Sequence, residues 1–298
     1  MNKSLEILKS IYKPLRYTIK GKATVLETTS GDFIIKEKNK DIKELYNYLR
    51  SRNFSFFPNL IDSSRKEVNV FEYINEINTP LEQKSEDLIT LIASLHEKTA
   101  YFKEVSEDNY KTIYEDIKNN ILFLKTYFNT LFEVYFKEIY MSPSQYLYMR
   151  NYSKIIASLE FCTDQLDEWY ELVKNETKIR VSVVHNNLEL NHFLKSDQDY
   201  LISWDNYKID TPIIDLVNFY QKEYLNINFE ILLEKYFNYF PLYEYEKKLL
   251  FILIAMPPVI NEYDEEFIKV KEMRKKIDYV FKTEEILRPY YTQEEKEE

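Results

Sequence analysis

The sequence predicts an α+β fold in which a small β-rich part is followed by a larger, mainly helical part. Three observations predict this order. Residues 23–72 contain short runs of β-prone residues, two of them around a glycine turn. Residues 88–173 carry apolar residues at helical spacing instead. A strand-like pattern then returns between residues 181 and 205, before the chain becomes helical again.

The length of 298 residues suits about two domains or one two-lobed unit. Hydrophobic residues make up 45% of the chain, which argues against general disorder. We expect a first lobe over residues 1–75 and a helical second lobe over residues 76–298. The sequence shows no signal-peptide core and no apolar run long enough for a bilayer. We therefore expect a soluble, cytoplasmic protein without a transmembrane segment.

Four short strands and one helix are expected in the first lobe. The strands cover residues 23–28, 33–37, 57–61 and 68–72. The first two flank a turn that contains Gly31, which is typical of a β-hairpin. The helix covers residues 41–51, whose apolar side chains share one face. Residues 73–79 are polar and unpatterned, so we expect a hinge there.

Helices dominate the second lobe. Apolar residues recur at helical spacing over residues 88–98, 113–140 and 148–173. Ser142, Pro143 and Gln145 predict a capping box at the start of the third helix. The spacing of the apolar residues in this helix favours an antiparallel pair of the last two helices. Cys162 falls in the apolar stripe and is expected in the core. The remaining elements are a strand at 181–184, a hairpin of 192–195 with 200–204, and helices from 215 to 282.

Composition excludes several functions. With only Gly21 and Gly31, the chain can form neither a P-loop, nor a Rossmann turn, nor a Gly-x-Ser-x-Gly elbow. Any nucleotide must therefore be bound without a glycine-rich fingerprint. The single cysteine excludes intrachain disulfides and cysteine-based metal sites. The net charge of −10 disfavours nucleic acid as a partner.

Three motifs follow one another around the predicted hairpin. Residues 185–194 read His-Asn-Asn-Leu-Glu-Leu-Asn-His-Phe-Leu, residues 202–205 read Ile-Ser-Trp-Asp, and residues 210–216 read Asp-Thr-Pro-Ile-Ile-Asp-Leu. Their order resembles the catalytic loop, metal motif and helix-opening motif of the aminoglycoside and choline phosphotransferase superfamily. The third motif resembles the spore-coat kinase-like branch most closely. The resemblance covers most of the chain and implies a protein-kinase-like bilobal fold, with ATP and Mg²⁺ as cofactors.

The resemblance also implies roles for individual residues. Lys36 corresponds to the strand lysine that grips the phosphates, and Glu44 on the next helix is a candidate partner for it. Residues 70–75 correspond to the hinge that holds adenine. His185 belongs to the catalytic loop, where we expect it to brace the loop. Asp215 opens a helix and is implied to brace the same loop.

Three positions depart from the pattern of the superfamily. The catalytic Asp position holds Asn187, whose amide has no charge and almost no basicity. The metal-binding Asp position holds Ser203, and the other metal-ligand position holds His192. Mg²⁺ prefers anionic oxygen ligands. The implied site therefore lacks carboxylates in their expected places.

A nearby carboxylate would restore part of the metal site. Asp205 lies two residues after Ser203, and residues i and i+2 of a strand face the same way. Asp205 is therefore a candidate metal ligand beside His192 and Ser203. Glu189 and Asp210 are further candidates.

These departures leave three hypotheses open. The first is a degenerate phosphotransferase, a pseudokinase that keeps a nucleotide site and acts through protein partners. The second is an active ATP-dependent small-molecule kinase in which Asp205 holds Mg²⁺ and Asn187 positions the acceptor hydroxyl. The third is a helical binding protein with accidental motif similarity. Nucleotide and protein are the expected partners, and nucleic acid is not.

Overall fold

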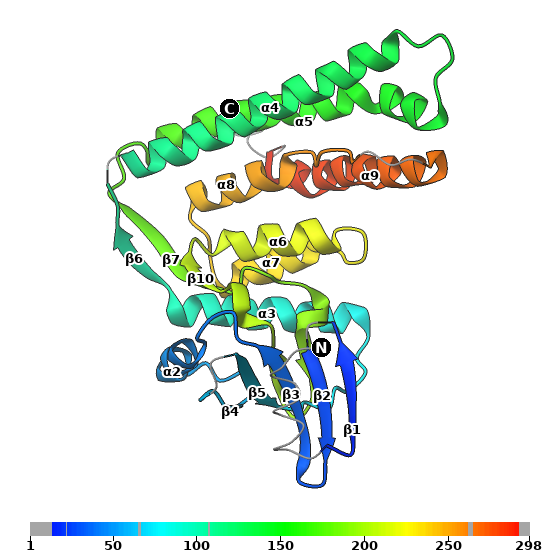
Figure 1. Ribbon diagram of the computed structural model, residues 1–298. Coiled ribbons are helices and arrows are strands. Elements are labelled where there is room, and N and C mark those ends of the chain that lie inside the picture. Colours follow the sequence, from blue (N-terminus) through cyan, green and yellow to red (C-terminus); the bar gives the residue numbers. More distant parts are fainter. Residues whose placement is uncertain (1–13, 22, 65–66, 107, 262–264, 292–298) are drawn as a thin grey trace. The chain divides into compact units, whose positions relative to one another are not determined.

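The computed structural model describes residues 14–21, 23–64, 67–106, 108–261 and 265–291 (Figure 1). A small antiparallel sheet and a larger set of helices confirm the predicted α+β class. The chain divides into two units. The first combines Met1–Ala100 with Ser182–Ile209, and the second combines Tyr101–Val181 with Asp210–Glu298. The expected lobe boundary at residue 75 stays a prediction.

A five-stranded sheet of order β1-β2-β3-β5-β4 forms the first part of unit one (Figure 1). Its strands are β1 (Arg16–Lys20), β2 (Ala23–Thr28), β3 (Gly31–Glu37), β4 (Leu60–Asp62) and β5 (Val68–Glu72). The hairpin predicted around Gly31 is confirmed, and Gly31 has a φ of 118° that favours glycine. Because alternate residues of a strand share a face, four apolar side chains meet in a core. They are Leu26, Ile35, Val68 and Val70.

Two helices and a hairpin complete the first unit. They are α2 (Lys43–Ser51), α3 (Leu81–Thr99) and the pair β8 (Phe193–Lys195) and β9 (Asp199–Leu201). Lys195 forms an ion pair with Asp87 of α3, and its carbonyl accepts a hydrogen bond from the Ile77 amide at 2.8 Å. Two short 3₁₀ turns, Leu190–His192 and Trp204–Asn206, flank the hairpin. Together they bring the motif residues 185–206 to the sheet.

The second unit is mainly helical. Its strands and helices are β6 (Tyr101–Glu104), α4 (Asp108–Phe136), α5 (Pro143–Val173), α6 (Ile213–Glu223), α7 (Phe229–Tyr239), α8 (Glu244–Ala255) and α9 (Glu266–Tyr291). The strands β7 (Lys178–Val184) and β10 (Lys208–Asp210) contain positions at which the chain passes between units. The first residues of β7 pair with β6 in antiparallel fashion. The helices α4 and α5 lie side by side and run in opposite directions (Figure 1), which confirms the predicted pair.

The start of α5 follows the predicted chemistry. Gln145 N donates to Ser142 Oγ, and Ser142 N donates to Gln145 Oε1 at 2.8 Å, which completes the capping box. Cys162 lies further along the helix and is fully buried, as expected. Burial raises the pKa of its thiol to about 12, so the thiol is protonated and unreactive at neutral pH. Cys162 is therefore a core residue.

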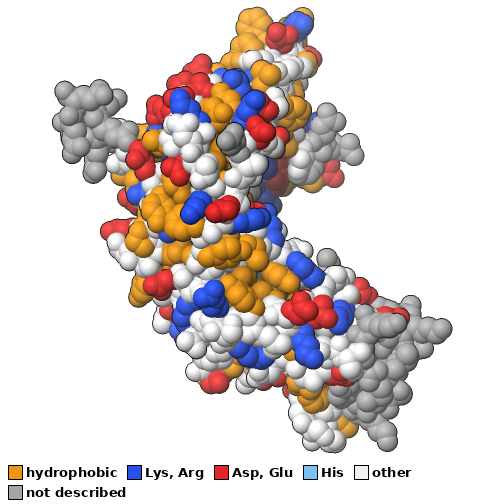
Figure 2. Space-filling view, turned by 90° about the vertical axis from the view of Figure 1, so that its left-hand side faces the viewer, with side chains coloured by type: hydrophobic (Ala, Val, Ile, Leu, Met, Phe, Trp, Pro, Cys, Tyr) orange, Lys and Arg blue, Asp and Glu red, His pale blue; other side chains and the backbone are white. Residues whose placement is uncertain are grey.

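The surface mixes charged and apolar side chains. On the face shown in Figure 2, Lys and Arg alternate with Asp and Glu, and groups of hydrophobic side chains lie between them. Within the described helices, we find no segment with the length and hydrophobicity that a membrane crossing requires.

Candidate functional site

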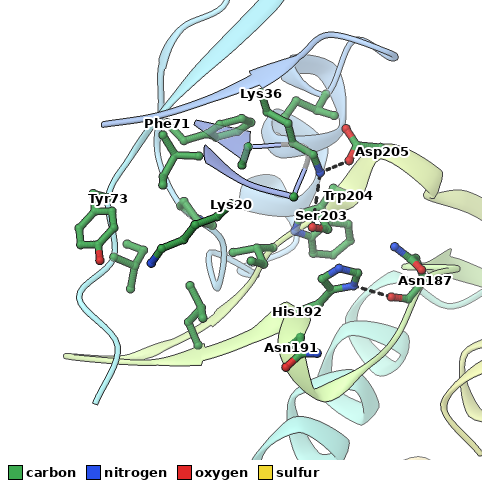
Figure 3. Close-up of a pocket in the computed structure, with 18 of the residues that line it drawn as sticks. Lys20, Lys36, Phe71, Tyr73, Asn187, Asn191, His192, Ser203, Trp204 and Asp205 are labelled. Atoms are coloured by element: carbon green, nitrogen blue, oxygen red, sulfur yellow. Dashed lines mark hydrogen bonds and ion pairs between the residues drawn. The ribbon is translucent and has the colours of Figure 1, made fainter. Parts of the chain in front are cut away.

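A cavity of about 870 Å³ lies within the first unit. Its lining comes from two stretches that are far apart in sequence, residues 20–76 and residues 187–206. The sheet contributes Lys36 of β3, and the motif region contributes Asn187 and Ser203 (Figure 3). The fold thus brings the first two sequence motifs to the predicted strand lysine.

The ammonium of Lys36 is held by the motif region. It forms an ion pair with Asp205 and donates a hydrogen bond to Ser203 Oγ at 3.4 Å (Figure 3). The Lys36 and Asp205 side chains are only 17% and 24% exposed, so solvent screens this pair less than a surface pair. Glu44 is exposed and forms no ion pair with Lys36 within the described residues. Asp205 therefore takes the place expected for Glu44.

The backbone turns sharply at Ser203, which has a left-handed φ of 67°. Two side chains hold this turn. His185 Nε2 donates to the Ile202 carbonyl at 2.7 Å, and Trp204 Nε1 donates to the Leu201 carbonyl at 2.7 Å. A non-glycine residue in this region is strained by about 1–2 kcal/mol and is often found at functional sites.

The turn corrects one expectation from the sequence. The hairpin strand predicted over residues 200–204 ends at Leu201, and Asp205 lies in a 3₁₀ turn instead. Ser203 and Asp205 therefore do not share a strand face, and that expectation was wrong. Both side chains still line the cavity and contact Lys36, because the left-handed residue folds the chain back toward the sheet.

His192 has a hydrogen-bond partner at each ring nitrogen. Nδ1 lies 2.8 Å from the Asn187 carbonyl, and Nε2 lies 3.0 Å from Glu189 Oε1. A carbonyl only accepts hydrogen bonds, so Nδ1 donates to Asn187. This contact ties His192 to the loop, and Nε2 lies beside the Glu189 carboxylate. The role of His192 as a metal ligand stays a prediction.

The remaining residues do not form a Mg²⁺ site. Nowhere in the described chain do three or more His, Cys, Asp or Glu side chains gather closely enough to hold a metal ion. Of the expected set, Asp205 supplies a single carboxylate, and Lys36 already pairs with it. Ser203 supplies a neutral hydroxyl, whereas Mg²⁺ is usually held by carboxylates. The donor set as arranged does not fit the implied metal.

The other predicted residues lie as follows. Asn187 lines the cavity, and its neighbour Asn186 donates to the Asn206 carbonyl at 3.1 Å, which ties the loop to the 3₁₀ turn. His185 is buried with its ring at 5.0 Å from that of Trp204, which suits a bracing role. Asp215 is fully buried in the first turn of α6, in the second unit.

Part of the expected hinge segment borders the cavity, as do Tyr46 and Lys20, which the sequence motifs did not indicate. Tyr73 and Ile74 of the expected hinge line the cavity. Tyr46 of α2 also lines it; burial, with a smaller contribution from the Asp205 charge, raises the pKa of its phenol. Lys20, at the end of β1, extends into the cavity (Figure 3). No local sequence pattern indicated that Lys20 lines the cavity.

Comparison with known proteins places this geometry in a known fold. No family model and no curated protein matches the sequence. An aminoglycoside phosphotransferase from Alicyclobacillus acidocaldarius matches with a TM-score of 0.69 at 10% identity, covering 94% of this chain and 92% of that one. A spectinomycin phosphotransferase solved with AMP matches with a TM-score of 0.56 at 13% identity, covering 94% and 97%.

A choline/ethanolamine kinase family protein from Mesorhizobium loti has a TM-score of 0.52 at 13% identity, covering 96% of each chain. At such identities the likeness is one of fold. The chain has the kinase-like fold of aminoglycoside phosphotransferases and choline kinases, which confirms the fold predicted from the motif order. The likeness to the spore-coat branch stays a prediction.

Proposed function

We propose that this protein is a nucleotide-binding pseudokinase, with the cavity of a phosphotransferase and without efficient phosphoryl transfer. One observation carries the proposal. Asn187 and Ser203, at the positions implied for the two catalytic carboxylates, line one cavity with Lys36. Loss of a general base costs about 10²–10⁴ in rate. The two losses affect one step, so their costs do not simply add.

Two observations support nucleotide as the ligand. The cavity of about 870 Å³ lies within the range of small-molecule sites and combines apolar walls with a few charged groups. Similar structures include spectinomycin phosphotransferase with AMP, and with ADP and spectinomycin. Action through protein partners, as the sequence suggested, stays a prediction.

Thermal unfolding of the full chain with ATP or ADP, with and without Mg²⁺, tests the proposal. We expect a rise of several degrees that does not need Mg²⁺, since a ligand at a hundredfold excess over Kd stabilises by about 2.7 kcal/mol. In Lys36→Ala, nucleotide should raise the midpoint of thermal unfolding by less, when each protein is compared with its own ligand-free midpoint. Lys43→Ala, an exposed lysine of α2 outside the cavity, should keep it.

Two outcomes would contradict the proposal in different ways. The absence of any shift with either nucleotide would remove nucleotide binding. Turnover above background on a panel of small alcohols and amines would remove the pseudokinase assignment, because the chain would then be an enzyme.

An active small-molecule kinase is the second candidate. The observation in its favour is that the Asp205 carboxylate lines the cavity beside Ser203. In that case Asp205→Asn would abolish turnover, because Asp205 would have to leave Lys36 and bind the metal. Glu76→Gln, which changes a cavity carboxylate outside the motif region, is the matched control and should keep its turnover. Unchanged turnover in Asp205→Asn would exclude this candidate.

A further inference from the structure

The turn between β1 and β2 is too short to surround a phosphate group. Lys20 pairs with Ala23 across the hairpin, so only residues 21 and 22 connect the two strands. Gly21 has a φ of 58°, which a two-residue hairpin turn favours. A loop that cradles phosphates needs several consecutive backbone amides directed at the ligand. A two-residue turn offers few of them, so the lysine side chains of the cavity must bind most of the negative charge of a nucleotide.

The carboxylates of the cavity already have hydrogen-bond donors. Asp205 has Lys36, and Glu189 has His192 at 3.0 Å. Glu76 accepts from Lys84 at 2.7 Å. The fourth carboxylate, Glu72, accepts from the Asn59 amide at 2.7 Å. None of the four needs a further cation from the cavity.

Lys20 is the cavity lysine for which no carboxylate was found among the described residues. Lys36 forms its ion pair with Asp205, whereas no ion pair of Lys20 occurs there. Figure 3 shows the Lys20 side chain extending from the end of β1 into the cavity toward Tyr73. A flexible ammonium with three donors can follow a phosphate group, which suits it to replace a missing loop.

We infer that Lys20 binds a phosphate group of the nucleotide in place of a glycine-rich loop. The inference rests on the proposed function and adds how the site recognises its ligand. Lys36, held by Asp205, has less free charge to offer, so a larger share of the phosphate recognition falls to Lys20. The site therefore distinguishes nucleotides from nucleosides through a side chain at the end of β1.

Calorimetric titration of the full chain with adenosine, AMP and ADP tests the inference. Lys20→Gln should weaken AMP or ADP about threefold to tenfold, the range for a charge-assisted contact partly open to solvent. Adenosine, which has no phosphate, should bind Lys20→Gln as it binds the unchanged protein. Lys20→Arg should retain most of the affinity, and the loss in Lys20→Gln should shrink at high salt.

Arg16→Gln is the matched control. Arg16 is an exposed residue of the same strand, lies outside the cavity and carries the same charge. Loss of the Arg16 charge should leave the affinities for adenosine, AMP and ADP unchanged. Equal weakening of adenosine and ADP by Lys20→Gln, or no weakening at all, would overturn the inference and leave nucleotide binding intact. Failure of the unchanged protein to bind any of the three ligands would overturn the proposed function, and the inference with it.

Discussion

At the scale of single residues, Asn187 and Ser203 carry the proposal that phosphoryl transfer is inefficient. Both side chains line the cavity, and neither supplies charge. We predict that the double substitution Asn187→Asp with Ser203→Asp raises ATP hydrolysis in Mg²⁺ by about tenfold or more, because a general base alone contributes about 10²–10⁴. Release of inorganic phosphate measures the rate of ATP hydrolysis. Asn191→Asp adds a carboxylate elsewhere in the cavity and should leave the rate at background.

Unchanged hydrolysis in the double variant would mean that these two positions do not limit the rate of hydrolysis. The ion pair of Lys36 with Asp205 is then the next feature to change, because it reduces the charge that Lys36 offers a phosphate.

Ser203 also allows a test of backbone strain. Its φ of 67° suits glycine and disfavours other residues. Ser203→Gly and Ser203→Ala both remove the hydroxyl near Lys36, so their difference isolates the backbone. We predict that the glycine variant is more stable to urea by about 1 kcal/mol. Equal stability of the two variants would mean that the turn is not strained.

The sequence predicted which residues share the site, but it did not predict all of their contacts. The motif order predicted that Lys36, Asn187, Ser203 and Asp205 share one site, and the cavity contains all four. The role of Asp205 as the partner of Lys36 was missed, because 169 positions separate the two residues and Glu44 was nearer in sequence. Local patterns do not encode such a pairing, since it depends on the backbone turn at residue 203.

The elements of the fold were predicted best where a local signal exists. The capping box at residue 142 needs only four consecutive residues, and the structure has it. The strand β6 was not anticipated, because its four residues are all exposed and their partners in β7 lie more than 70 positions later. The end of β9 was misplaced, because residues 202–204 are β-prone while side-chain hydrogen bonds bend the chain there.

The capping box gives a prediction at the scale of the element. Ser142→Ala removes the hydroxyl that accepts from Gln145 N, so it should destabilise the protein by about 1 kcal/mol. For a chain of this size the melting temperature falls by about 2–4 °C. Ser153→Ala, at an exposed interior position of the same helix, should leave it unchanged. An equal fall in both variants would mean that the cap contributes nothing.

At the scale of the whole molecule, the two tryptophans report on different units. Trp204 lines the cavity in the first unit, and Trp169 is buried in the second. In Trp169→Phe, the remaining Trp204 should change its fluorescence when ADP binds. In Trp204→Phe, the remaining Trp169 should show little change. A response from Trp169 alone would place the ligand outside the cavity described here.

The division of the chain has a consequence for how the protein is made. Residues 1–100 leave the ribosome first, yet their unit is complete only when Ser182–Ile209 has followed. During synthesis Lys36 therefore lacks its carboxylate partner while the 81 residues from 101 to 181 emerge. Contacts of such long range slow folding and prolong the exposure of apolar surface. The cavity is thus a late product of folding, and a chain that stops before residue 205 cannot form it.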